Sequence, residues 1–355
     1  MSCYHPMVLL KTSNMTDPQQ RKIADILALR HKGSGKSTST FIVPRELAER
    51  EGIRLEENKA VLVPCGHCIG CRLDYSRYWA ERCVHEADAH EENYFLSLTY
   101  DDEHLPIGSK GIATLIEDEI SSFMKRLRTT FKRKFGIVGI RFFGCGEYGT
   151  PGQGSRISHP HYHIILFNCP IPDLQERHPI MVDGKLKWIF QYDDEGNKLL
   201  FSPTIHECWN KYGTAQIGQV SYESCAYVAR YIVKKQLGNE AQQYRDCGIL
   251  PPFVRMSRRP GIGYDWYDEH YEQLFVYDNY IFKRGDKAFP VKPGRYYDRL
   301  VKDRDIQAYY ELKEKRHRDF YDAVDCKTYE AVDLVHNNLN AEADKLRSIK
   351  LLKRN

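Results

Sequence analysis

The chain has 355 residues, of which 28% are charged and 42% are hydrophobic, and its formal net charge is +4. This composition predicts a soluble globular protein of one large domain or two ordinary ones. No apolar run reaches the roughly 18 residues of a membrane-spanning helix, and the N-terminus lacks the pattern of a secretion signal. The mild positive charge permits a polyanionic partner without requiring one.

The first predicted element is a helix that begins at Asp17-Pro18 and ends near Arg30, with Asp as its cap and Pro at the first helical position. A polar loop, 31–40, follows and contains the letters GSGKST. This string is similar to the end of a phosphate-binding P-loop, but the full motif needs a glycine where Arg30 stands and follows a strand. ATP binding is therefore an alternative function and not the preferred one.

Alternating and periodic apolar residues predict the later elements. Strands are expected at 94–100, 137–149, 161–167 and 214–221, and helices at 73–90, 117–135 and 223–236. The turn-rich region 170–212 should form a hairpin excursion, the chain beyond 267 should be loop-like to about 300, and the charged last 50 residues should be mostly helical. This order favours an α+β fold with an antiparallel central sheet and flanking helices.

Three histidines alternate in the stretch SHPHYHIILF, 158–167. Because side chains alternate across a strand, His161 and His163 should share one face with Ile165 and Phe167, and the residues between them should take the other. Two imidazoles about 6–7 Å apart on one face can bind a single ion. The alternative is a pair of hydrogen-bonded core histidines.

Glu147 ends the preceding predicted strand, and a short polar loop leads from it to the histidines. If the two strands are neighbours, Glu147 lies beside His161 and His163. Two imidazoles and a carboxylate with open positions for water or substrate suit a divalent ion such as Mn²⁺ or Mg²⁺. The alternative is that Glu147 is a turn carboxylate.

Tyr227 and Tyr231 lie four residues apart in the predicted helix of residues 223–236, so their side chains share one face. Such a pair often belongs to an aromatic core stripe. Arg230, Lys234 and Lys235 crowd the same helix, however, which favours an anionic neighbour. A tyrosine can attack a phosphodiester when a metal ion polarises the phosphoryl oxygens, and two tyrosines allow two successive transfers.

The stretch VPCGHCIGCR carries three cysteines with the spacing C-x₂-C-x₂-C, namely Cys65, Cys68 and Cys71. Tyr75 stands where a bacterial iron–sulfur run has its fourth cysteine, which argues against a cluster. Tetrahedral zinc needs a fourth ligand, and Cys3 is the first choice, with His67 and His5 as further candidates. The alternative is a set of reduced thiols around a glycine-rich turn.

The segment KRLRTTFKRK, 125–134, places six basic residues on a predicted helix whose other face is a phenylalanine stripe. A solvated helix face and a contact with the DNA backbone are equally good interpretations of this pattern.

Taken in order, these motifs resemble those of the HUH endonucleases, the rolling-circle initiators. His161-Tyr162-His163 resembles their His-hydrophobic-His motif, FLSLTY occupies the place of their first strand motif, and GEYG matches the strand end that supplies a third metal ligand. YVARYIVKK is similar to the two-tyrosine helix of the replication initiators of microviruses. MSCYHP, VPCGHCIGCR, RYWAERC and MSRRPGIG resemble the gokushovirus branch, so the resemblance covers roughly residues 60–262 and the first few residues.

The resemblance implies an HUH domain with a ferredoxin- or RRM-like core at residues 61–240, which includes the cysteine cluster. It is preceded by an extension, 1–60, and followed by a mostly helical extension, 241–355; the cysteine spacing adds a zinc-binding N-terminal part to this fold. The implied activity is a nick at the viral origin, made through a 5′-phosphotyrosine bond with release of a 3′-hydroxyl, and rejoining into circular single strands.

By the same resemblance, each implied function falls on particular residues. The metal ligands would be Glu147, His161 and His163; the nucleophiles would be Tyr227 and Tyr231; and Lys234 or Lys235 would steady the phosphate. His159 has no clear family role. The implied partners are single-stranded and duplex viral origin DNA and the host helicase and DNA polymerase, in the cytoplasm of a bacterial host. The alternative is a non-catalytic, zinc-stabilised DNA-binding protein.

Overall fold

The computed structural model describes residues 3–30, 40–55, 57–58, 60–149, 159–193, 196–210, 212–234, 239–284, 287–324 and 341–347. The chain forms two compact units: the first comprises Met1–Tyr75 and Asp319–Asn355, and the second comprises Ser76–Arg318. These boundaries fall at other positions than the divisions at 60/61 and 240/241 that the sequence suggested.

The first unit contains a three-stranded antiparallel sheet that the sequence analysis did not predict. Its strand order is β2-β1-β3. Val8 and Leu10 alternate with more exposed residues along β1 and pack against Ala24 and Leu27 of α1. The elements of this unit are β1 (Met7–Lys11), η1 (Thr12–Asn14), α1 (Pro18–Arg30), β2 (Thr40–Pro44), α2 (Arg45–Arg50), β3 (Val61–Val63), the first residues of α3 (Ile69–Asp88) and a short helix at 341–347.

The second unit is built on a five-stranded antiparallel sheet with the strand order β11-β4-β6-β5-β12. The bounds are β4 (Tyr94–Tyr100), β5 (Arg141–Tyr148), β6 (Pro160–Phe167), β11 (Gly213–Gln219) and β12 (Phe253–Met256). The first four strands confirm the prediction, and β12 adds an edge strand from beyond residue 240. The histidine strand, β6, is therefore the central strand.

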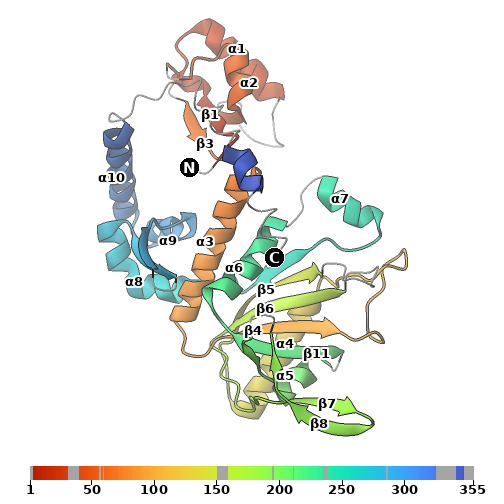
Figure 1. Cartoon of the computed structure of the whole chain (residues 1–355). Helices are drawn as coiled ribbons and strands as arrows, with labels where there is room; N and C mark the ends of the chain where they lie inside the picture. The colour runs from red at the N-terminus through yellow and green to blue at the C-terminus, as the bar shows by residue number, and fades with distance from the viewer. Residues whose placement is uncertain are drawn as a thin grey trace. The chain divides into compact units, whose positions relative to one another are not determined.

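Helices cover both faces of this sheet (Figure 1). On one face, α4 (Glu119–Phe135) and α5 (Pro203–Cys208) pack against Tyr162, Ile164 and Leu166 of β6. On the other face, α3 and α6 (Tyr222–Lys234) pack against Ile165 and Phe167. The alternation predicted for β6 is thus confirmed. The expected phenylalanine stripe of α4 also lies in the core and ends at Gly136, which has φ 73° and caps the helix.

The hairpin excursion predicted for residues 170–212 is confirmed. It consists of the pairs β7 (His178–Val182) with β8 (Lys185–Ile189) and β9 (Gln191–Tyr192) with β10 (Lys198–Leu199), followed by α5.

The expectation of a loop-like chain from 267 to about 300 is wrong. This part forms α8 (Tyr264–Tyr277), the hairpin of β13 (Tyr280–Arg284) and β14 (Lys287–Val291), and α9 (Arg295–Arg304). Tyrosine and aspartate are poor helix formers and gave no clear helical signal in α8. Packing decided the outcome: Trp266, Tyr267, Tyr280 and Tyr297 form a separate aromatic core.

Two further helices, α7 (Asn239–Asp246) and α10 (Ile306–Val324), agree with the expected helical C-terminal part. The chain is therefore an α+β protein with antiparallel sheets, as predicted. Within the described ranges, no helix combines the length and apolar character needed to cross a membrane.

Candidate functional site: a carboxylate, two histidines and a tyrosine

The pairing of β5 with β6 brings Glu147 opposite His161 and Cys145 opposite His163. These residues point to the sheet face that α3 and α6 cover, because Cys145, Ile165 and Phe167 lie in the core on that side. The candidate site thus lies where β5 ends and β6 begins. The polar loop between the strands includes residues 150–158, which lie outside the described residues.

The three side chains converge on one carboxylate oxygen. Oε1 of Glu147 lies 3.0 Å from Nε2 of His161 and 2.9 Å from Nε2 of His163. All three ligand-type atoms lie within 4.8 Å of one another. Only 3% of the Glu147 side chain and 10% of the His163 side chain are exposed, so the site is shielded from bulk water.

The hydrogen bonds of His161 indicate a cation between these groups. Its Nδ1 lies 3.0 Å from the carbonyl oxygen of His159, which can only accept a hydrogen bond, so Nδ1 carries the proton. In a neutral imidazole, Nε2 then presents a lone pair to the carboxylate of Glu147. Two lone pairs 3.0 Å apart repel each other unless a proton or a metal ion lies between them.

The surroundings of His163 favour a neutral imidazole. Burial lowers the pKa of its imidazole, although the neighbouring Glu147 works in the opposite direction. Neutral imidazole is the form that binds metals. Two imidazoles and one carboxylate leave coordination positions for water or substrate, so the residues present fit a divalent ion such as Mn²⁺ or Mg²⁺.

Helix α6 places a phenol at the same carboxylate. The hydroxyl of Tyr227 donates to Oε1 of Glu147 over 2.9 Å and lies 3.5 Å from Nε2 of His163. Cys225, Val228 and Ala229 of α6 are fully buried against the sheet and fix the helix in this position. The core interpretation of Tyr227 is thus incomplete, because its ring packs in the core while its hydroxyl reaches the candidate metal site.

The other proposed residues of α6 are only partly described. The backbones of Tyr231 and Lys234 continue the helix, but their side chains lie outside the described part of the structure, as does all of Lys235. The guanidinium carbon of Arg230 lies 5.6 Å from the centre of the Tyr227 ring. This cation favours negative charge near the phenol.

Sequence reasoning missed the contribution of Phe95. Its ring stacks on His163 at 5.3 Å between centroids and contacts Tyr227 edge-on at 6.5 Å. Phe95 therefore fixes the orientation of an imidazole and the phenol together. The signal was available in the predicted strand 94–100, since residues 95, 97 and 99 lie on the same sheet face as the histidines of β6.

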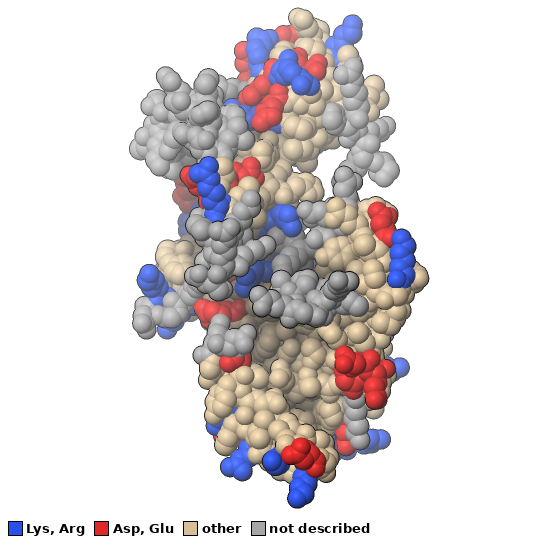
Figure 2. Space-filling view, turned by 45° about the vertical axis from the view of Figure 1, so that its right-hand side comes forward, with Lys and Arg blue, Asp and Glu red and all other residues tan. Residues whose placement is uncertain are grey.

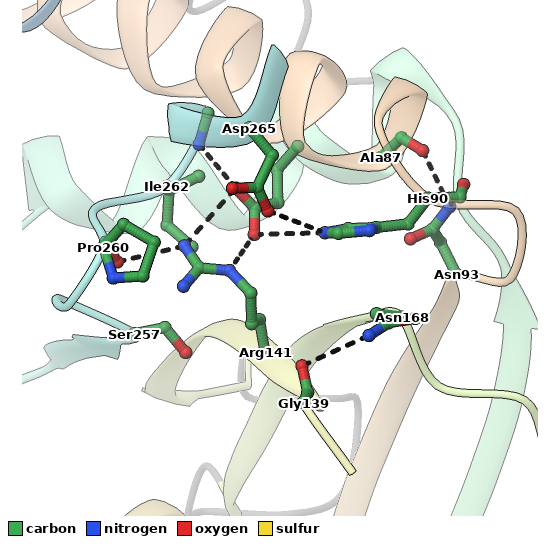
Figure 3. Close-up of polar contacts among 12 residues, drawn as sticks. Ala87, His90, Asn93, Gly139, Arg141, Asn168, Ser257, Pro260, Ile262 and Asp265 are labelled. Atoms are coloured by element: carbon green, nitrogen blue, oxygen red, sulfur yellow. Dashed lines mark hydrogen bonds and ion pairs between the residues drawn. The ribbon is translucent and has the colours of Figure 1, made fainter. Parts of the chain in front are cut away.

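The segment MSRRPGIG is held by a buried ion pair (Figure 3). Arg141 of β5 pairs with the fully buried Glu86 of α3 and donates to the carbonyl oxygens of Pro260 and Gly261 at 3.1 and 3.0 Å. Glu86 also accepts from the backbone of Gly263, whose φ of 80° is the left-handed conformation that favours glycine. This network fixes the chain between β12 and α8.

Four cysteines of the first unit also converge. The sulfur atoms of Cys3, Cys65, Cys68 and Cys71 lie within 4.8 Å of one another and form a candidate Cys₄ metal site. Cys3 thus lies where the predicted fourth ligand would be. Of the two other candidates, His5 pairs with Glu342 and His67 is exposed.

Three of the six basic residues in the segment 125–134 bind other parts of the fold. Arg126 donates to the carbonyl oxygen of Cys208, Arg128 to that of Ile140, and Lys134 to the hydroxyl of Thr204. Helix α4 covers the face of the sheet opposite Glu147, and its other three basic residues, Lys125, Lys132 and Arg133, are exposed, so a DNA contact there stays a prediction. On the face shown in Figure 2, the described basic and acidic residues are interspersed. The GSGKST string lies outside the described residues.

Fold and geometry together define an α+β protein with a candidate metal centre on the central antiparallel sheet and a tyrosine on the helix α6 that covers it. The model of the ORF2-type replication-associated protein family matches residues 93–236, from β4 through α6. Among relatives, the replication-associated protein ORF2 of Spiroplasma virus 4 is 34% identical over 261 residues, which cover 72% of this chain and 73% of that protein. No solved structure shows significant similarity.

Two further relatives carry similar names. The replication-associated protein VP4 of Bdellovibrio phage phiMH2K is 30% identical over 71% of both chains. The replication-associated protein ORF4 of Chlamydia phage 1 is 32% identical over 49% of this chain and 38% of its own length. The chain therefore belongs to the family of replication initiator proteins of microviruses, and its role lies in the initiation of phage DNA replication.

Proposed function

We propose that this chain is a metal-dependent endonuclease that nicks one strand of the viral origin through a covalent tyrosine bond and later rejoins it. The single observation that carries this proposal is the position of the Tyr227 hydroxyl, which donates to the same carboxylate oxygen that contacts both histidines. This position supports a phenol that acts together with the proposed metal ligands.

Tyr227 and Glu147 have separate roles in the first transfer of the DNA phosphate. The phenol oxygen of Tyr227 forms a bond to phosphorus while the bond from phosphorus to the 3′-oxygen breaks. The 5′ end then remains on the tyrosine as a phosphodiester, and the other strand end leaves as a free 3′-hydroxyl. Glu147 orients the phenol and can accept its proton, which the departing 3′-oxygen finally requires.

Glu147, His161 and His163 would hold the divalent ion. When bound, Mn²⁺ or Mg²⁺ polarises the phosphoryl oxygens and stabilises the negative charge that develops on them. Phe95 and the carbonyl group of His159 keep the two imidazoles in the orientation this task requires.

Rejoining needs a second nucleophile, because the first tyrosine is occupied by the DNA end. Tyr231 follows Tyr227 by one helical turn of α6 and is the proposed second nucleophile. Lys234, or Lys235, is proposed to steady the phosphate during the transfers.

The order of strands and helices supports an HUH assignment. The His-hydrophobic-His motif lies on the central strand, the carboxylate on its neighbour, and the tyrosine on a helix that covers the same face. The proposed substrate is viral origin DNA inside the infected cell, and the released 3′-hydroxyl would serve a host polymerase, together with a host helicase.

The test is incubation of the full-length protein with labelled single-stranded origin DNA and Mn²⁺, followed by a denaturing gel. A labelled protein–DNA adduct that forms only with the divalent ion is expected. Binding without any adduct would overturn the proposal in favour of a non-catalytic DNA-binding protein. Turnover of ATP by the protein alone would instead favour the ATPase alternative.

A further inference from the structure

The second cluster of metal-ligand residues, Cys3, Cys65, Cys68 and Cys71, lies in the first unit and takes no part in the proposed nicking chemistry. Cys3 precedes β1, Cys65 and Cys68 lie in the turn after β3, and Cys71 lies in the first turn of α3. More than 60 residues separate Cys3 from the others in sequence. Only the folded first unit brings the four sulfur atoms together.

The distances between sulfur atoms match those around a single ion. Sγ of Cys65 lies 3.9 Å from Sγ of Cys71, and Sγ of Cys68 lies 3.9 Å from Sγ of Cys3. A disulfide requires about 2.05 Å, so the cysteines are not cross-linked. Four sulfurs at a Zn–S distance of about 2.3 Å in a tetrahedron lie about 3.8 Å apart.

Backbone N–H groups donate hydrogen bonds to three of the four sulfur atoms. The amide of Tyr4 donates to the sulfur of Cys68, that of Cys65 donates to Cys3, and those of His67 and Cys68 donate to Cys65, all over 3.2 to 3.4 Å. Gly66, with φ 78°, makes the turn that aims the last two amides. Donors aimed at sulfur favour its anionic, metal-binding form.

The cluster offers four protein ligands and no open position. Cys3, Cys68 and Cys71 are buried, and the nearby histidines have other positions: His67 is exposed and His5 contacts Glu342. A closed set of four thiolates is typical of a structural zinc site, whereas the carboxylate and histidines of the second unit suit a harder ion.

We propose that Cys3, Cys65, Cys68 and Cys71 form a closed tetrahedral zinc site that fastens the segment before β1 to the start of α3. The protein then contains two metal centres of different chemistry, a structural thiolate centre in the first unit and an exchangeable centre at Glu147. The zinc centre is independent of the nicking proposal, because all four of its ligands belong to the first unit and none has a role in the transfer of the phosphate.

The two centres can be separated by chelation of the full-length protein. After dialysis against EDTA and gel filtration, elemental analysis should find about one equivalent of zinc per chain. Release of this zinc by a mercurial reagent, followed with a colorimetric zinc indicator, should begin only after the exposed Cys247 has reacted and should follow modification of the cluster thiols. Zinc below about a tenth of an equivalent, or iron in its place, would overturn the proposal.

Variants test the assignment of the ligands. Cys68→Ser should lose most of the zinc, whereas the matched control Cys247→Ser, which alters an exposed free cysteine, should retain it. If Cys68→Ser fails to fold, cobalt substitution of the wild-type protein provides a second measurement, since four thiolates give an intense sulfur-to-cobalt charge-transfer absorption. Equal zinc in both variants, or no such absorption, contradicts the site.

Discussion

At the scale of single residues, Glu147 is the centre of the candidate active site. One of its carboxylate oxygens contacts His161, His163 and the hydroxyl of Tyr227. Only 3% of the Glu147 side chain is exposed, so water cannot take over these three contacts if the carboxylate is removed. Each of these groups is therefore expected to affect catalysis through the others, and the effects of single substitutions will not add.

The double substitution His161→Ala and His163→Ala should abolish nicking while the protein stays folded. If these residues hold the proposed ion, its loss would remove several kcal/mol of charge stabilisation in the transition state, so we expect a rate lower by at least about 1,000-fold. The measurement is Mn²⁺-dependent cleavage of labelled origin DNA, with circular dichroism to verify folding. His159→Ala is the matched control, because only its backbone contacts His161. Cleavage by the double variant at the wild-type rate would refute the metal ligands.

Phenylalanine at Tyr227 or at Tyr231 should preserve some cleavage but impair the release of closed circles. Both substitutions together should remove the covalent adduct, because no phenol then reaches the phosphate. Gel analysis of adducts and of circular products measures the two steps separately. Tyr222, the first residue of α6, is the next candidate nucleophile if an adduct persists. An adduct in the double variant would show that the nucleophile is another residue. Normal release of closed circles by a single variant would refute the proposal that the two tyrosines act in turn.

At the scale of elements, buried ion pairing holds the loop between β12 and α8. Arg141 and Glu86 join β5 to α3, and both also bind backbone groups of residues 260–263. Gly261 and Gly263 pack closely here, because a Cβ atom would meet the hydroxyl oxygens of Tyr296 and Tyr297 at 2.5 and 2.6 Å and those side chains would have to shift. The motif PGIG is thus explained by backbone binding and close packing.

Glu86→Gln should destabilise the second unit strongly. The change leaves the buried guanidinium of Arg141 without its counter-charge, and breaking a buried pair in this way costs about 3–5 kcal/mol. Glu117→Gln, which breaks the partly exposed pair with Arg255, should cost only about 0–1 kcal/mol. Urea denaturation of both variants measures the difference. Equal stability of the two would show that the network contributes little.

At the scale of the whole molecule, buried neutral histidines link folding to pH. His85 is 2% exposed, stacks on Trp266 and hydrogen-bonds to Tyr297. Burial, with smaller effects of His270 and Arg82, lowers the pKa of His85 to about 3. In the unfolded chain its pKa returns to about 6.5, so below that pH the unfolded state binds more protons than the folded state.

The free energy of unfolding should therefore be highest above about pH 6.5 and fall as the pH is lowered toward 3. His85 alone should contribute a slope approaching 1.4 kcal/mol per pH unit, to within a factor of about two. Denaturation between pH 7.5 and 5 measures the slope in the wild type and in His85→Asn, which cannot titrate. A shallower slope is expected in the variant, whatever its absolute stability. Identical slopes would exclude His85 as a source of the pH dependence of stability.

Local sequence patterns were sufficient to predict which residues are buried in single strands and helices. The alternation in β6 correctly predicted which residues share each face, and the four-residue apolar period predicted the buried stripe of α4. The same alternation placed Glu147 beside the histidines, because a short connection makes two successive strands neighbours in an antiparallel sheet. Whether these side chains act as metal ligands stays a prediction.

The sequence by itself thus determined the α+β class, the central strands, the pair of histidines and the tyrosine helix, since these follow from periods of two and 3.6 residues. Only the tertiary structure decided the N-terminal sheet, the helix α8, the ion pair of Glu86 with Arg141, and the choice of Cys3 over His5 and His67 beside the other three cysteines. Each of these depends on contacts between residues far apart in the chain. Their free energy comes from packing and from burial of charge, for which a local pattern carries no signal.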